Sequence, residues 1–187
     1  MGEEGLELLA RPVSFQASTQ PDELLERFAD RQMMGEMQKV FFSDEPNSLG
    51  HSYARLLHGP GGRHDLTDVI ELLQKEPSTK RALVTFLSVP NGKIPCVTAV
   101  QFLVREQALQ LIYFARGQDA FGKFYADALC LIRLAEKVAQ SLGLGLGSVR
   151  GLIGSSHIYH RDMPKIRETL DAAHKSLTAR RTEGVLA

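Results

Sequence analysis

Cys96 is the residue in this sequence best suited to act as a nucleophile. It follows Pro95 and opens an apolar, β-branched segment, and Arg116 closes the next such segment. A cysteine becomes reactive when a nearby cation stabilises its thiolate, and the planar guanidinium of arginine can also bind phosphate. A cysteine at the start of an apolar strand is nevertheless usually a small buried hydrophobe. Cys96 can therefore be interpreted either as a core residue or as a covalent catalyst.

Other combinations of residues in the chain do not predict a metal or dinucleotide site. The two cysteines, Cys96 and Cys130, match neither a disulfide framework nor a zinc pattern. His157 and His160 have the spacing of a strand or turn and lack a third ligand. The stretch GLGLGS at 143–148 follows a helical pattern and not a strand, so we interpret it as a helix stop and turn.

Composition predicts one soluble domain over residues 1–187, with 1–20 and 178–187 as the segments expected to be less ordered. The chain is 43% hydrophobic and 24% charged, as in ordinary globular proteins. The net charge is zero, so no general attraction to DNA, RNA or a membrane surface is predicted. The N-terminus starts with acidic residues and no stretch approaches the roughly 20 apolar residues that cross a bilayer. We therefore expect a cytoplasmic protein.

Hydrophobic periodicity predicts helices and strands that alternate without a strict βαβ order. Helices are predicted at 21–42, 66–77, 124–143 and 163–177, and strands at 6–15, 81–89, 96–106, 108–118 and 148–159. Loops rich in Gly, Pro, Asn and Asp are predicted at 43–50 and 58–65. Asp65 is a plausible N-cap and Gly143 a C-terminal stop. The expected fold is α+β, with a mixed β-sheet flanked by helices.

Three segments that contain these chemical groups together resemble the thymidylate synthase family. The segment IPCVTAVQFLVR (94–105) is similar to the family's Pro-Cys…Gln-Phe segment, and ARGQDAFGKFYADA (115–128) resembles its Arg-Ser-x-Asp…Asn segment. The segment SSHIY (155–159) resembles its His-x-Tyr segment. All three stand in register with the family without a gap, and SYARLL (52–57) and residues 64–82 match upstream. The ordered spacing is more specific than any single motif.

The resemblance implies a layered fold that dimerises through its sheet, and a reaction at a pyrimidine nucleotide. Cys96 would add to C6 of the base, which turns C5 into a carbon nucleophile toward the methylene group of 5,10-methylenetetrahydrofolate. Arg116 would lie beside the thiolate and bind the nucleotide phosphate. Lys80 and Arg81 match a pair that reaches the partner's phosphate in a homodimer, although Lys80 lacks the bidentate fork of arginine.

The resemblance also assigns the remaining site residues. His157 and Tyr159 would bind the sugar hydroxyl, Gln101 belongs to the substrate site, and Asp119 would hold the pterin ring of the folate. For the family's catalytic glutamate, Glu23 is a loose candidate.

Asp127 is the departure that bears most on the substrate, because the family has asparagine at this position. An asparagine amide donates and accepts, which suits N3–H and O4 of uracil, whereas a carboxylate accepts from the amine of cytosine and from a protonated N3. The cytidylate hydroxymethylases of the same superfamily resemble this sequence in having Asp, and there water captures the methylene in place of a hydride. Cytidylate hydroxymethylation is therefore predicted. A uridylate methylase, a non-catalytic nucleotide-binding homologue, and an Asp127 that merely faces solvent are the alternatives.

Other departures concern phosphate and folate more than the nucleophile. Gly117 replaces a phosphate-binding serine, Val97 replaces a histidine, and Lys123 stands where a folate-site glycine is expected. The N-terminal region has no recognisable phosphate-binding arginine loop, and the chain ends in LTARRTEGVLA without a hydrophobic tail. A changed substrate or cofactor therefore stays open.

Overall fold

A five-stranded mixed sheet organises the chain. The computed structural model describes residues 5–15, 22–43, 45, 47, 49, 52–58, 66–86 and 94–184. The strands lie in the order β1-β5-β4-β3-β2, and β4 and β5 are parallel while the other neighbours are antiparallel. Their bounds are β1 Gly5–Phe15, β2 Leu83–Thr85, β3 Val97–Arg105, β4 Ala108–Asp119 and β5 Gly145–Tyr159.

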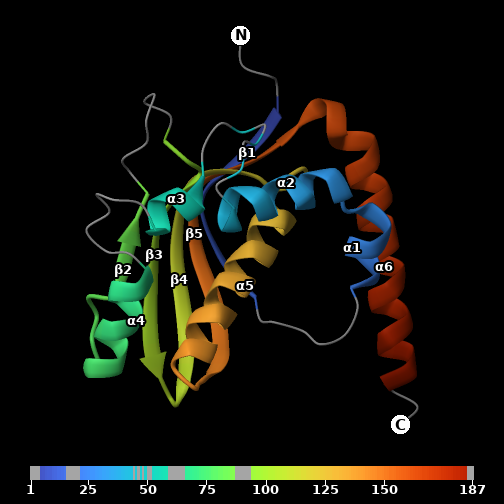
Figure 1. The fold of residues 1–187 in the computed structure, drawn as a ribbon. Helices are drawn as coiled ribbons and strands as arrows, with labels where there is room; N and C mark the ends of the chain where they lie inside the picture. Colours follow the sequence, from blue (N-terminus) through green and yellow to red (C-terminus); the bar gives the residue numbers. More distant parts are fainter. Residues whose placement is uncertain are drawn as a thin grey trace.

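Helices cover one face of this sheet (Figure 1). Helix α5 connects the parallel strands β4 and β5 and lies along the sheet, with α2 beside it and α3 next to α2. Helix α4 lies against β2 and β3, and α1 lies next to α6 at one end (Figure 1). The bounds are α1 Glu23–Phe28, α2 Arg31–Phe42, α3 Tyr53–His58, α4 Leu66–Lys75, α5 Phe124–Ser141 and α6 Met163–Gly184, and the 3₁₀ turn His160–Asp162 precedes α6. The predicted α+β fold with a mixed sheet flanked by helices is confirmed.

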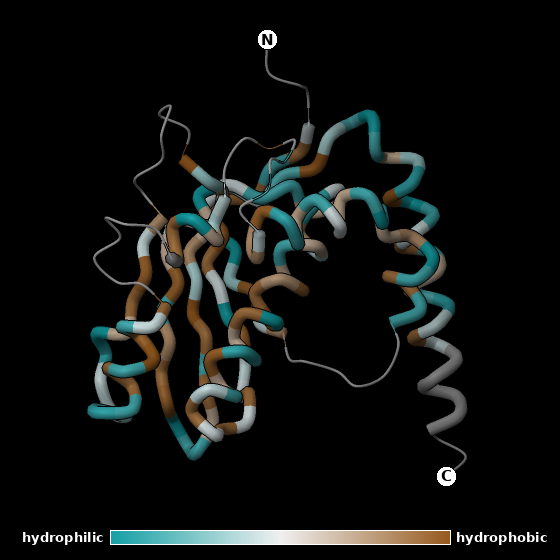
Figure 2. Tube along the Cα trace, viewed as in Figure 1, coloured by the Kyte–Doolittle hydropathy of each residue, from teal (hydrophilic) through white to brown (hydrophobic). Residues whose placement is uncertain are grey.

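The core forms between α5 and the sheet, where the apolar segments of Figure 2 converge. Helix α5 buries a stripe with helical spacing, and β4 buries every second residue against it. The stripe includes Leu131, Leu134 and Val138, all at most 1% exposed, and it meets Leu109 and Leu111, which are fully buried. Each such side chain contributes about 1.5–3 kcal/mol through burial. This packing fixes α5, and with it the residues at its N-terminus, relative to β3 and β4.

The single helix predicted over 21–42 is wrong, because the chain breaks between α1 and α2. Asp30 is extended, and its side chain accepts hydrogen bonds from the backbone N–H groups of Gln32 and Met33 at 2.8 and 3.1 Å. The Asp30 N–H donates to the Tyr125 hydroxyl at 2.9 Å, which ties the break to α5. An aspartate stabilises the start of a helix, because its side chain accepts hydrogen bonds from the first free N–H groups. In the interior of a continuous helix those groups are already paired, and the aspartate side chain would compete with the backbone.

Most other boundaries agree with the prediction. Gly143 has a positive φ of 67° and ends α5, as expected for a glycine stop. The turn predicted over 143–148 is partly wrong, because β5 already begins at Gly145. Helix α3 was not predicted as an element, and the proposed N-cap Asp65 and residues 87–89 of the predicted strand 81–89 lie outside the described residues. None of the described helices is long and apolar enough to cross a membrane.

Candidate active site

Cys96 lies immediately before β3 in a segment that is anchored on both sides. The N–H of Val97 donates to the buried Tyr53 hydroxyl at 3.0 Å, and the Cys96 carbonyl accepts from the Arg116 N–H at 2.9 Å. Cys96 is partly exposed. Cys130, in contrast, is 3% exposed, and burial raises the pKa of its thiol to about 12. The description of an inert buried cysteine therefore fits Cys130 and not Cys96.

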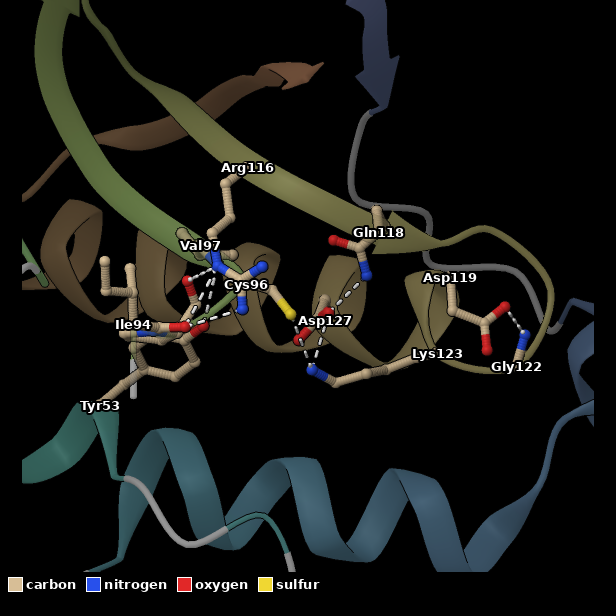
Figure 3. Close-up of polar contacts among 11 residues, drawn as sticks. Tyr53, Ile94, Cys96, Val97, Arg116, Gln118, Asp119, Gly122, Lys123 and Asp127 are labelled. Carbon is tan, nitrogen blue, oxygen red and sulfur yellow. Dashed lines mark hydrogen bonds and ion pairs between the residues drawn. The ribbon is translucent and has the colours of Figure 1, made fainter. Parts of the chain in front are cut away.

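Lys123 is the cation in contact with the Cys96 sulfur (Figure 3). Its ammonium Nζ donates to Sγ at 3.8 Å and lies 3.7 Å from Oδ2 of Asp127. The Lys123 side chain is only 13% exposed, so its charge is less screened than that of a surface lysine. An ammonium so placed stabilises a thiolate and a carboxylate together.

Arg116 holds the chain next to the sulfur. Its guanidinium donates from Nε and Nη2 to the carbonyl oxygen of Ile94, at 3.1 and 2.8 Å, and from Nε to that of Pro95 at 3.2 Å. These two carbonyls directly precede Cys96, so Arg116 fixes the backbone that presents the thiol (Figure 3). The contact to sulfur predicted for Arg116 is made by Lys123. The phosphate role of Arg116 stays a prediction.

Asp127 points into the protein from the first turn of α5. It is 1% exposed, so the solvent-facing alternative is wrong. Its Oδ2 accepts from Nε2 of Gln118 at 2.6 Å as well as facing Lys123. Burial raises the pKa of Asp127, and the Lys123 charge and the Gln118 hydrogen bond oppose that rise. Burying a charged carboxylate costs free energy unless hydrogen-bond donors or cations pair with it.

Replacing Asp127 by asparagine is expected to change how the stability of the fold depends on pH. Because the pKa of Asp127 is raised above its ordinary value of 3.8, the folded chain holds this proton more tightly than the unfolded chain. The free energy of unfolding of the wild type therefore falls, relative to the variant, as pH rises through this range. Urea unfolding between about pH 4 and about pH 7 should show the variant's relative advantage growing with pH. A constant difference would contradict the assignment.

Three buried polar atoms around Asp127 have no hydrogen-bond partner among the described residues. They are the Tyr113 hydroxyl, Oε1 of Gln118 and Oδ1 of Asp127. Burial and the Asp127 charge raise the pKa of Tyr113. A Cβ on Gly151 would clash with the Tyr113 ring, so glycine is needed beneath it. Buried polar atoms are rarely left unpaired in native proteins, so Oε1 of Gln118 and Oδ1 of Asp127, whose side chains are hydrogen-bonded to each other, can pair with water or with a polar ligand.

Asp119, His157 and Tyr159 lie where the parallel strands end. Oδ1 of Asp119 accepts from the N–H groups of Phe121 and Gly122 at 3.1 and 2.8 Å, which closes the turn into α5. Asp119 is opposite His157 in the register of β4 and β5, and Nε2 of His157 lies 3.3 Å from the Tyr159 hydroxyl. The strands thus bring the three predicted ligand-binding residues to one end of the sheet. Their roles stay predictions.

The remaining predicted site residues lie outside the group formed by Cys96, Lys123, Asp127 and Gln118. Gln101 alternates with the buried residues of β3, so it lies on the other face of the sheet, and its Nε2 donates to the Lys80 carbonyl at 2.7 Å. Arg81 is paired with Glu76 at 2.6 Å.

Glu23 is exposed in the first turn of α1, which contacts α6. Its catalytic role stays a prediction. Among the described residues, no group of three or more His, Cys, Asp or Glu is placed to hold a metal ion.

The fold and the site define an α+β protein with a partly exposed cysteine next to a buried Lys–Asp–Gln group. Residues 25–182 match the family described as Thymidylate synthase. The chain belongs to the thymidylate synthase family.

Several similar proteins carry the name "Putative thymidylate synthase". That of Methanococcoides burtonii is 29% identical over 153 residues, which cover 79% of this chain and 67% of the relative. That of Methanosarcina barkeri is 30% identical over 146 residues, or 75% and 64% of the two chains. That of Methanocaldococcus jannaschii is 31% identical over 110 residues, or 54% and 50%. The matched region is thus about two thirds of the length of the first two relatives.

Proposed function

We propose that the protein transfers a one-carbon unit to C5 of a pyrimidine nucleotide, and that the nucleotide is cytidylate. The observation that carries the proposal is the contact of Lys123 Nζ with both Cys96 Sγ and the buried carboxylate of Asp127. The contact joins a nucleophile, its stabilising cation and a base-recognition group. Family membership supports the reaction class, and Asp127 supports the choice of base.

The residues of the chain account for the covalent step. The Cys96 thiolate forms a bond to C6, the electron pair of the C5–C6 double bond moves to form a C4–C5 double bond, and the C4–N3 pair moves to N3, which takes up a proton from solvent water. The carboxylate of Asp127 can accept a hydrogen bond from that N3–H and from the exocyclic amine. Reversal of the step expels the thiolate, which the Lys123 ammonium stabilises.

The one-carbon donor implied by the family is 5,10-methylenetetrahydrofolate, which supplies an electrophilic methylene group when bound. A hollow of about 410 Å³ beside the Asp119 turn is lined by Phe121 and Tyr125, by the cations Arg27 and Lys165, and by the acidic Asp30, Asp162 and Glu168, of which Glu168 is paired with Arg27 at 3.2 Å. In the proposal the two aromatic rings would contact the flat parts of the cofactor and Lys165 would meet a carboxylate. Lys123 lies between this turn and α5, and its Nζ contacts Cys96 Sγ.

A homodimer that forms through the sheet belongs to the same proposal. The sheet face opposite α5 leaves large apolar side chains 39–44% exposed, namely Leu83, Ile112, Phe114 and Leu152. An apolar surface of this kind is typical of a protein interface. Lys80 and Arg81 precede β2, the edge strand of this sheet, and in the dimer they would bind the nucleotide phosphate of the neighbouring subunit.

Asparagine at position 127 is expected to reverse the base preference. Its Oδ1 would still accept from Gln118 Nε2, so its Nδ2–H₂ would face the ring and present a donor where Asp127 presents an acceptor, which suits the uracil edge better than the cytosine edge. We expect the ratio of C5 exchange rates, cytidylate over uridylate, to fall roughly 10²-fold, as for a hydrogen bond to a charged group that is lost and replaced by a mismatch. If Asp127→Asn keeps the preference for cytidylate over uridylate, Asp127 has no role in base recognition.

The product identifies the reaction. Wild-type protein with 5,10-methylenetetrahydrofolate and either nucleotide should give a hydroxymethylated cytidylate, identified by mass spectrometry. A methylated uridylate would instead establish the uridylate methylase alternative. Nucleotide binding without any product would establish the non-catalytic homologue.

A further inference from the structure

Gln118 faces the site because the alternation of β4 changes phase just before it. Leu111, Tyr113 and Ala115 are buried at every second position, and the next buried residue of the strand is Gln118. Regular alternation would have turned Gly117 toward α5 and Gln118 away from it. The change of phase instead turns the Gln118 side chain, which is 1% exposed, toward Asp127 (Figure 3).

The orientation of the Gln118 amide follows from its partner. An ionised carboxylate only accepts hydrogen bonds, so the nitrogen of the amide must face Oδ2 of Asp127, to which it donates at 2.6 Å. Oε1 then has to face away. Oε1 of Gln118 and Oδ1 of Asp127 are both buried, and neither has a hydrogen-bond partner among the described residues. The site therefore offers two unsatisfied acceptors, and a ligand that satisfies both must carry two donors.

We propose that Gln118 is a second base-specificity residue, whose Oε1 acts with Oδ1 of Asp127 to select a pyrimidine edge that carries two donors. This inference rests on the function proposed above and concerns a residue to which the family resemblance assigns no role. The edge of cytosine carries an exocyclic amine and gains an N3–H when the Cys96 adduct forms. Uracil presents only N3–H as a donor, and its O4 would meet Oε1 as a second acceptor. Gln118 thus favours cytosine and also disfavours uracil.

The amide cannot easily turn round to accommodate uracil. A rotation that presents Nε2 to the ligand would place Oε1 against Oδ2 of Asp127, and two acceptors would then face each other without water. Asp127 itself is held by the Lys123 ammonium at 3.7 Å. The selectivity therefore depends on the fixed pair of side chains and not on either residue alone.

The test compares the kcat/KM for exchange of the C5 hydrogen of cytidylate and uridylate, in ribose and deoxyribose forms, because exchange passes through the adduct in which N3 carries a proton. Gln118→Met keeps the length of the side chain but removes both polar groups, and we expect it to lower the preference for cytidylate at least about tenfold while exchange with uridylate holds or improves. The matched control is Gln110→Met on the same strand, because Gln110 is also hydrogen-bonded, through Oε1 to the N–H and hydroxyl of Ser148 at 2.9 and 2.7 Å. This control should lose stability and keep the preference.

The outcomes distinguish a failure of the role of Gln118 from a failure of the proposed function. An equal loss of exchange with both nucleotides in Gln118→Met, or an unchanged preference, overturns the role of Gln118 and leaves the reaction at C5 intact. A folded wild type that exchanges the C5 hydrogen of neither nucleotide overturns the proposed function and this inference together. If Gln118→Met does not fold by circular dichroism, Gln118→Asn, which withdraws the amide without adding charge, must show the same loss of preference.

Discussion

Cys96→Ala is expected to abolish exchange of the C5 hydrogen while nucleotide binding survives. Exchange requires addition of the thiolate to C6, and alanine offers no nucleophile, so the rate should fall by at least about 10⁴-fold. The side chain is partly exposed, and the backbone around it is held by Tyr53 and Arg116. Its truncation should therefore leave the pocket in place. Exchange is measured with labelled nucleotide and binding by calorimetry on the same preparation.

Cys130→Ala is the matched control for this experiment. Cys130 is buried in α5, and burial raises the pKa of its thiol to about 12, so it supplies no thiolate near neutral pH. Its loss should affect stability and leave exchange unchanged. If exchange persists in Cys96→Ala, or disappears in a folded Cys130→Ala, the identity of the nucleophile is wrong.

Lys123→Met is expected to slow C5 exchange by about 10²–10³-fold, as when a preorganised charge is removed from a reacting centre. The variant keeps the aliphatic length of the side chain and removes the ammonium from both Cys96 Sγ and Asp127 Oδ2. The thiolate loses its contacting cation, and the buried carboxylate loses the charge that compensates its desolvation. The measurement is the exchange rate at saturating nucleotide, which separates this effect from weaker binding.

Lys137→Met serves as the control for removal of a lysine from α5. Lys137 is exposed and lies over the Phe42 ring at 4.5 Å, away from Cys96, so exchange should be unaffected. A comparison with Arg116→Met decides which cation stabilises the Cys96 thiolate. If Lys123→Met exchanges normally and Arg116→Met does not, the guanidinium and not the ammonium stabilises the thiolate.

Much of the fold could be predicted because its elements have strong local signals. The helix at α5 has a long apolar stripe and ends at Gly143, and the strands β3 and β4 alternate over most of their length. The break at Asp30 was missed because the apolar pattern continues across it, although Asp30 is a good N-cap for α2. The local cap and the contact of the Asp30 N–H with Tyr125 of α5 together place that boundary.

The site was predicted less completely than the fold. Cys96 and Asp127 stood out by type and by resemblance, and Lys123 was noted only as a departure from the family. A lysine that precedes a helix has no sequence signal that it reaches back to a cysteine 27 residues away. Gln118 was missed because strand periodicity assigns it to the opposite face, and the change of phase in β4 reverses this assignment. The only feature of the sequence that could have indicated Gln118 is that it is a polar residue near the end of a strand.

Release of tritium from C5-labelled cytidylate and uridylate, with and without 5,10-methylenetetrahydrofolate, tests the central claim most directly. Exchange reports the addition of Cys96 to C6 before the fate of the one-carbon unit is decided. The account predicts release from cytidylate, little or none from uridylate, and none in Cys96→Ala. Absence of release from both nucleotides in the folded wild type would contradict covalent chemistry at this site.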